Sequence, residues 1–210
     1  MEEINLIELL KSLGKNNTMA IIERDMESFG ALEALKMVNY LLSIEETVWL
    51  VSYEPLLSLL ANLKFVGINV DDFLGKNLYI VDVFGSMKRI EHLEPGVYVI
   101  GGYLDDGVFV TKYRNLIRSF IGSLSQIPKR VWIVDYLASD VCRLFSNPLR
   151  TYKSIWALRY EVPQSDIRAI LTYNPAECPE LEDFIYSYSD VVVEVYTDGG
   201  KRHFIVTKGE

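Results

Sequence analysis

The chain has 210 residues, is 50% hydrophobic and carries a formal net charge of −8. This length predicts one domain, residues 1–210, with a sizeable core. The acidic balance argues against nucleic-acid binding, because phosphate contacts need clustered Lys and Arg. No apolar run is long enough to cross a bilayer and the acidic N-terminus differs from a signal peptide, so we expect a cytoplasmic protein without a membrane partner.

Short β-rich apolar runs alternate with helical patterns along the chain. Several runs are apolar on both faces, as residues 131–134 (VWIV) illustrate. Such runs are typical of parallel strands covered by helices on both sides. The predicted strands are Met19–Glu23, Val48–Tyr53, Leu78–Val83, Val97–Ile100, Val131–Asp135, Ala169–Tyr173, Val191–Tyr196 and Phe204–Thr207.

Helical patterns lie between these strands. Gly30–Leu42 is apolar except on one narrow stripe, which indicates a mostly buried helix. Pro55–Val66 begins with a proline, whose missing N–H costs nothing at a helix start. The predicted helices are Ile4–Leu13, Gly30–Leu42, Pro55–Val66, Tyr113–Leu124, Tyr136–Phe145 and Pro179–Tyr188. The acidic pair Asp105 and Asp106 is predicted to lie in a solvated loop.

The alternation predicts an α/β fold with a mainly parallel, doubly wound sheet. The last two strands are joined by residues 197–201 (TDGGK). Asp-Gly followed by Gly tolerates positive φ angles, so the sheet should end in an antiparallel hairpin.

The two cysteines, Cys142 and Cys178, lie far apart without the spacing of a metal site. In a cytosolic protein we expect two reduced thiols rather than a disulfide or a zinc site.

Residues 21–32 (IIERDMESFGAL) occupy the place where a nucleotide-binding fold would have a strand, a glycine loop and a helix. A working phosphate loop has the pattern G-x-x-x-x-G-K-[ST]. Only Gly30 is retained, because Asp25 replaces the first glycine, Ala31 the lysine and Leu32 the hydroxyl residue. The pattern therefore predicts no nucleotide cofactor, no metal and no ATP hydrolysis.

Three further segments resemble the RecA-like core of KaiC-type ATPases, and in particular a group of small archaeal proteins with degenerate cores. Residues 48–55 (VWLVSYEP) resemble a strand that ends in a Ser-Phe-Glu-Glu-like segment. Residues 129–135 (KRVWIVD) resemble the Walker B strand, and residues 189–195 with 202–209 resemble the terminal hairpin. The resemblance implies a RecA-like, P-loop NTPase-type three-layer sandwich.

The chain departs from this family at its catalytic positions. Glu54 matches the first catalytic glutamate, but Pro55 stands at the second. Asp135 matches the aspartate that orients Mg²⁺ through water in the family. Lys208 matches a lysine that reaches nucleotide across a subunit interface, without the arginine that should follow it. No catalytic residue is therefore assigned.

These features favour a non-catalytic binding or regulatory module. In open α/β sheets, ligands bind beyond the carboxyl ends of the strands, and a crevice there would survive the loss of the phosphate loop. We predict a protein or peptide partner, with basic side chains that match the acids of the crevice. A homo-oligomer is also compatible with the resemblance. The predicted crevice residues are Asp25, Glu27, Phe29, Gly30, Tyr53, Glu54, Asp135 and Tyr136.

Two other functions, and a purely structural role for two of the acids, are alternatives. A nucleotide-binding sensor or weak NTPase would keep Asp135, Glu54 and Lys208 and would bind through backbone amides near Gly30. An unrelated enzyme on the same sheet finds no nucleophile–base pair in the sequence. Asp25 and Glu27 could also simply cap the Gly30–Leu42 helix.

Overall fold

A computed structural model describes residues 4–25, 27–91, 94–123, 128–161 and 166–209. Its strands form one eight-stranded sheet in the order β4-β3-β2-β5-β6-β1-β7-β8. Among the described strands, only the β7–β8 pair is antiparallel. The predicted mainly parallel sheet with a C-terminal hairpin is confirmed.

All eight predicted strands are present, with ends that differ from the prediction by at most three residues. The apolar runs of β1, β2 and β3 are almost fully buried, as expected for parallel strands between two helical layers, whereas β8 at the sheet edge has no buried residue. The bounds are β1 Thr18–Glu23, β2 Thr47–Ser52, β3 Leu78–Asp82, β4 Val97–Tyr98, β5 Arg130–Tyr136, β6 Asp166–Tyr173, β7 Val191–Asp198 and β8 Lys201–Lys208.

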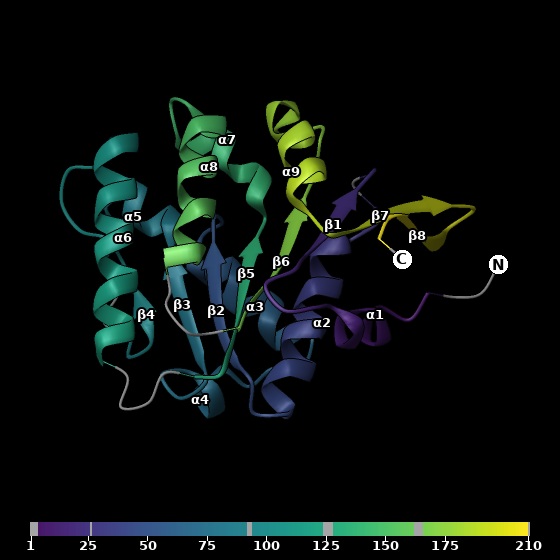
Figure 1. Ribbon diagram of the computed structural model, residues 1–210, viewed down its shortest axis with the longest axis horizontal. Coiled ribbons are helices and arrows are strands. Elements are labelled where there is room, and N and C mark those ends of the chain that lie inside the picture. The colour runs from purple at the N-terminus through teal and green to yellow at the C-terminus, as the bar shows by residue number, and fades with distance from the viewer. Residues whose placement is uncertain (1–3, 26, 92–93, 124–127, 162–165, 210) are drawn as a thin grey trace.

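Helices cover both faces of the sheet (Figure 1). One face packs against α1 Leu6–Ser12, α2 Gly30–Ser43 and α3 Leu56–Phe65, near the short α4 Val70–Phe73. The other face packs mainly against α6, α8 and α9. The elements of this second layer are α5 Val83–Lys88, α6 Asp106–Ser123, η1 Ala138–Asp140, α7 Val141–Leu144, α8 Pro148–Ala157, η2 Leu158–Glu161, η3 Pro179–Leu181 and α9 Glu182–Tyr188.

The predicted helix Tyr136–Phe145 begins too early. β5 continues through Tyr136, which pairs with Ser52 of β2. Leu137 then adopts a left-handed conformation (φ 56°), which breaks the chain direction before the short η1 and α7 begin. Apolar composition alone did not indicate this bend, because a leucine rarely adopts positive φ.

The prediction of a solvated loop holds for Asp105, which is exposed and lies before α6, but is wrong for Asp106. Asp105 accepts the N–H of Val108 (2.8 Å), and α6 begins at Asp106, seven residues earlier than predicted. The Asp106 carboxylate then accepts bonds from the start of the α8 region: Ser146 N (3.1 Å), Asn147 N (2.7 Å) and Thr151 Oγ1 (3.0 Å). The predicted end of this helix at Leu124 lies outside the described residues.

The expectation of two reduced thiols is corrected as well, because Cys142 and Cys178 form a disulfide. Cys142 lies in α7 after β5, and Cys178 follows β6. Because β5 and β6 are adjacent parallel strands, the segments that follow them meet at the same edge of the sheet. Sequence spacing carries no information about this contact.

None of the helices in the described ranges is both long and apolar enough to cross a membrane.

Asp106→Ala should lower the free energy of unfolding by about 1–3 kcal/mol, because three donors near the start of α8 lose their charged acceptor. Urea denaturation followed by circular dichroism measures this change. Asp71→Ala on exposed α4 is the matched control and should lower stability by less than about 0.5 kcal/mol. Equal losses in both variants would show that the α6–α8 contact contributes little.

Candidate functional site: an acidic crevice at the carboxyl edge of the sheet

A crevice of about 490 Å³ opens where four parallel strands end. Glu23 is the last residue of β1, Glu54 follows β2, Tyr136 ends β5 and Asn174 follows β6. All four line the crevice. Its position is the one at which open α/β sheets bind ligands, and its volume suits a small molecule or a few side chains of a peptide.

The side chain of Glu23, the last residue of β1, caps the N-terminus of α2. Its carboxylate Oε1 accepts the backbone N–H of Ala31 at 2.8 Å, in the first turn of the helix. Gly30 permits this approach, because a Cβ there would lie 3.0 Å from Glu23 Cγ. Free helix N-termini attract anions through such N–H groups. Here the protein's own carboxylate fills the place that a phosphate would take.

Burial raises the pKa of Glu23, although its bonds with the backbone of Ala31 and Gly30 favour the charged form. The carboxylate is thus held by the helix terminus at some cost in desolvation. Neither Asp25 nor Glu27 provides this cap, and the N-cap residue Phe29 makes no side-chain bond to the helix.

Glu54 is a carboxyl group of the crevice with a single hydrogen bond among the described residues. It is 8% exposed, and Asn62 of α3 donates to its Oε1 at 3.3 Å. Burial, which outweighs the Asn62 bond, raises the pKa of Glu54 to about 7, and the negative charge of Asp140 adds to the shift. Glu54 is therefore near its titration midpoint at neutral pH, and a cation in the crevice would favour its ionised form.

Arg143 is the one cation among the described residues that line the crevice. It is already paired, with Asp140 at 3.0 Å and with Glu177 at 3.1 Å. The second oxygen of Glu177 accepts the Ser139 hydroxyl at 3.0 Å. The lining therefore presents four carboxyl groups, on Glu23, Glu54, Asp140 and Glu177, against a single guanidinium.

Tyr53 and Asp135 do not reach the crevice. Successive side chains of a strand point to opposite faces, so Asp135 lies opposite its neighbour Tyr136. The Asp135 side chain points into the second helical layer, where it is 3% exposed. There its carboxylate accepts a hydrogen bond from the Tyr152 hydroxyl at 3.0 Å. Burial raises its pKa to about 6. Tyr53 is fully buried in that layer beside Tyr152, so neither residue can touch a partner or hold a metal from the crevice.

Of the other six predicted crevice residues, three line the crevice and three do not. Phe29, Glu54 and Tyr136 line the crevice. Asp25 points to the terminal hairpin, where it accepts Thr197 N at 2.6 Å, and also accepts Glu27 N at 3.0 Å. Glu27 is exposed, and Gly30 is buried behind Glu23.

The Lys208 side chain is bonded within the chain. Its ammonium group donates to the carbonyls of Tyr186 (2.8 Å) and Ser187 (3.1 Å) near the C-terminus of α9. A cation is favoured at that end of a helix, so in this chain the residue holds the hairpin against α9.

The sequence interpretation missed most of the polar lining. Glu23 and Asn174 stand directly at strand ends, and that position is a usable signal once the strands are known. The other missed residues are Asn62, Asp140, Arg143 and Glu177. They come from helices and loops whose approach to the crevice depends on tertiary packing.

No protein-family model matches the sequence, and no curated protein is detectably similar to it. Solved structures do resemble it. The uncharacterized protein PH0321 of Pyrococcus horikoshii, crystallised in complex with an unknown peptide, has a TM-score of 0.83 at 21% identity, over 97% of this chain and 89% of that chain.

Two further structures are similar over nearly the whole chain. The flagellar accessory protein FlaH of Methanocaldococcus jannaschii has a TM-score of 0.61 at 14% identity, covering 100% of this chain and 86% of that chain. The KaiC-like protein PH0186 of Pyrococcus horikoshii has a TM-score of 0.57 at 13% identity, covering 94% and 82%. At these identities the likeness shows the fold, and the chain has a RecA/KaiC-like core.

Glu23→Ala should expose the N–H groups of α2 and allow inorganic phosphate to bind with a Kd on the order of millimolar. Glu23→Gln is the matched control, because its amide oxygen still accepts the Ala31 N–H although the charge is gone. Isothermal titration with phosphate compares them. Equal phosphate binding by both variants would mean that the negative charge of Glu23, and not its hydrogen bond to the Ala31 N–H, excludes the anion.

Ala31→Lys with Leu32→Thr should not restore ATP binding by itself, since the Glu23 carboxylate still fills the helix terminus and repels phosphate. Adding Glu23→Ala to this pair should strengthen ATP binding relative to the double variant. Titration calorimetry with Mg·ATP is the measurement, and tight binding by the double variant would contradict this account of the loop.

Proposed function

We propose that the protein is a non-catalytic RecA-like module whose crevice binds a basic segment of a peptide or protein. The observation that carries this proposal is Glu54, a nearly buried carboxyl group with one long hydrogen bond at 3.3 Å in an acid-lined crevice. A lysine side chain inserted there would supply both the missing charge and up to three donors.

The charge of the lining supports a cationic ligand over a nucleotide. The lone guanidinium of Arg143 is shared between Asp140 and Glu177, so it offers little to a phosphate. The helix terminus that could have bound one is filled by Glu23. Each remaining carboxyl group would repel a polyphosphate and attract an ammonium group.

The rim of the crevice supplies apolar contact. Phe29 is 52% exposed there, in a left-handed conformation with φ 48°. A bulky residue rarely adopts positive φ without a functional or packing reason. Leu32, Pro55 and Leu137 add apolar surface beside the acids. Aromatic anchors next to polar groups are typical of peptide-binding sites.

The structural neighbour PH0321 was crystallised with an unknown peptide. That observation belongs to PH0321, and it supports a peptide as the kind of ligand that this fold accommodates once it no longer serves a nucleotide. The absence of a phosphate-loop lysine and hydroxyl, with Ala31 and Leu32 in their places, supports a non-catalytic role.

A fluorescein-labelled hexalysine peptide should bind more tightly as the pH rises from 5.5 to 8. The ammonium group pairs with ionised Glu54, whose folded-state pKa of about 7 means that acid keeps it protonated. Binding should therefore release protons and level off above the pKa. Fluorescence anisotropy at several pH values measures the profile, and affinity should fall as salt rises.

Glu54→Gln should weaken hexalysine binding about tenfold at pH 8, the loss of one charge-assisted contact, and should remove the slope near pH 7. Asp71→Asn removes the same charge from exposed α4, outside the crevice lining, and should behave as wild type. If both variants lose equal affinity, the peptide is attracted by net charge alone and the crevice is not its site.

A further inference from the structure

The segments that follow β5 and β6 form one wall of the crevice, and a disulfide links them to each other. Cys142 of α7 and Cys178 are disulfide-bonded with their Cα atoms 5.6 Å apart, although 36 positions separate them in the sequence. Their immediate neighbours Arg143 and Glu177 line the crevice and pair at 3.1 Å. The wall is thus held by adjacent covalent and ionic links between the same two segments.

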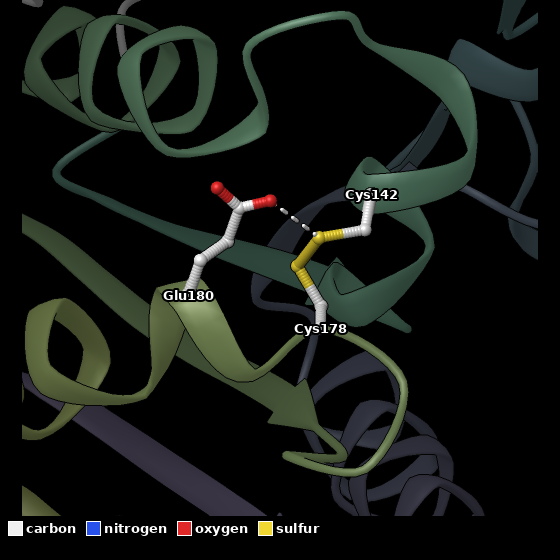
Figure 2. A group of neighbouring side chains, drawn as sticks. All are labelled: Cys142, Cys178 and Glu180. Atoms are coloured by element: carbon white, nitrogen blue, oxygen red, sulfur yellow. Dashed lines mark hydrogen bonds between the residues drawn. A yellow bond between two sulfur atoms is a disulfide. The ribbon is translucent and has the colours of Figure 1, made fainter.

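The two sulfur atoms differ in access and surroundings. Cys178 has no exposed surface, whereas Cys142 is partly exposed, so an external thiol can reach the disulfide only at Cys142. Figure 2 shows the Glu180 carboxylate turned toward the Cys142 sulfur, with Oε1 at 3.2 Å. A disulfide sulfur carries no hydrogen, so this contact becomes a hydrogen bond only when Cys142 is a thiol.

We propose that this disulfide is a site of reversible reduction by a dithiol, and that its redox state sets the rigidity of the crevice wall. The attacking thiolate bonds to Cys142 Sγ, the S–S bond breaks, and Cys178 leaves as a thiolate that takes up a proton. The second thiol of the reductant then displaces Cys142, which leaves as a thiol. The protein gains two electrons and two protons, and the dithiol becomes a disulfide.

Glu180 acts on both directions of this exchange. Its negative charge repels an approaching thiolate and slows reduction. After reduction its oxygen accepts the Cys142 S–H, which stabilises the thiol form and makes that sulfur a poorer nucleophile for closing the bond again. One carboxylate therefore slows interconversion without preventing it.

Reduction leaves the wall to non-covalent contacts. Arg143, whose side chain is 65% exposed, would then hold Glu177 through an ion pair that water screens. The Ser139–Glu177 hydrogen bond would remain as well. Because the effect on ligand affinity rests on the proposed function, it needs a readout separate from the change in the wall itself.

Hydrogen exchange followed by mass spectrometry tests the wall directly. The full chain is compared in its oxidised form, after treatment with dithiothreitol, and as Cys142→Ser with Cys178→Ser. We expect exchange in peptides covering 138–144 and 174–178 to be roughly tenfold faster in the reduced and double-serine proteins, with the rest of the sheet unchanged. Unchanged exchange in these peptides, or a disulfide that resists dithiothreitol in the folded protein, would overturn the proposal.

The rate of reduction by dithiothreitol tests the role of Glu180. Glu180→Gln should be reduced several-fold faster than wild type at low ionic strength, and the difference should shrink at high salt. Asp183→Asn removes the same charge from exposed α9 nearby and is the control. Equal rates for wild type and Glu180→Gln would remove Glu180 from the mechanism.

Hexalysine affinity, measured in both redox states, separates this inference from the proposed function. We expect at least about threefold weaker binding to the reduced protein, a change of about 0.65 kcal/mol. If the oxidised protein binds no hexalysine, the proposed function fails, while the exchange data still decide the redox proposal. Equal affinity in both states with faster exchange would overturn its regulatory part.

Discussion

The bond from the Ala31 N–H to the Glu23 carboxylate, 2.8 Å long, is the constraint on which the architecture of the crevice depends. It satisfies a backbone donor at the first turn of α2, a group that every helix leaves without an internal partner. It also favours glycine at position 30, since a Cβ there would lie only 3.0 Å from Glu23 Cγ. The single glycine kept from the phosphate-loop pattern thus serves a carboxylate of the protein.

This substitution changes what the edge of the sheet can bind. In a working phosphate loop the backbone donors and a lysine converge on an anion. Here the donor is used internally, and burial raises the pKa of the carboxyl group that uses it. That donor is therefore not available to a phosphate group, and the other carboxyl groups of the crevice would repel one. The position that binds nucleotides in P-loop folds is thus lined mainly by carboxyl groups in this chain, which is the basis for the cationic ligand that we propose.

The sequence was sufficient to predict the layers and the edge of the sheet at which the site lies. Short apolar runs, helical stripes and the turn at residues 197–201 are local signals, and the eight strands and the terminal hairpin were predicted from them. The bend at Leu137 was not predictable in this way, because leucine rarely adopts the positive φ that this residue has. The ranges of the short η1 and α7 depend on that bend.

The composition of the site was harder to predict than its location. Asp135 and Tyr136 are neighbours in β5 and therefore point to opposite faces of the sheet. Tyr53 and Glu54 follow β2, and Tyr53 is buried in the second layer whereas Glu54 lines the crevice. The sequence alone leaves open which member of each pair faces the crevice, since both faces of these strands are covered. Arg143 and Glu177 reach the crevice only because β5 and β6 are neighbours, a fact of sheet order.

Sheet order also explains why charge, backbone and redox chemistry meet at one place. The segments after β5 and β6 carry Asp140, Arg143 and Glu177 into the crevice and are cross-linked immediately beside these residues. Glu54, which follows β2, also lines the crevice, and the charge of Asp140 contributes to its raised pKa. In the functions that we propose, a movement of the cross-linked wall would change the electrostatic environment of Glu54, and a cation bound at Glu54 would change the forces on that wall. The two effects are reciprocal, as any coupling between ligand binding and a conformational equilibrium must be.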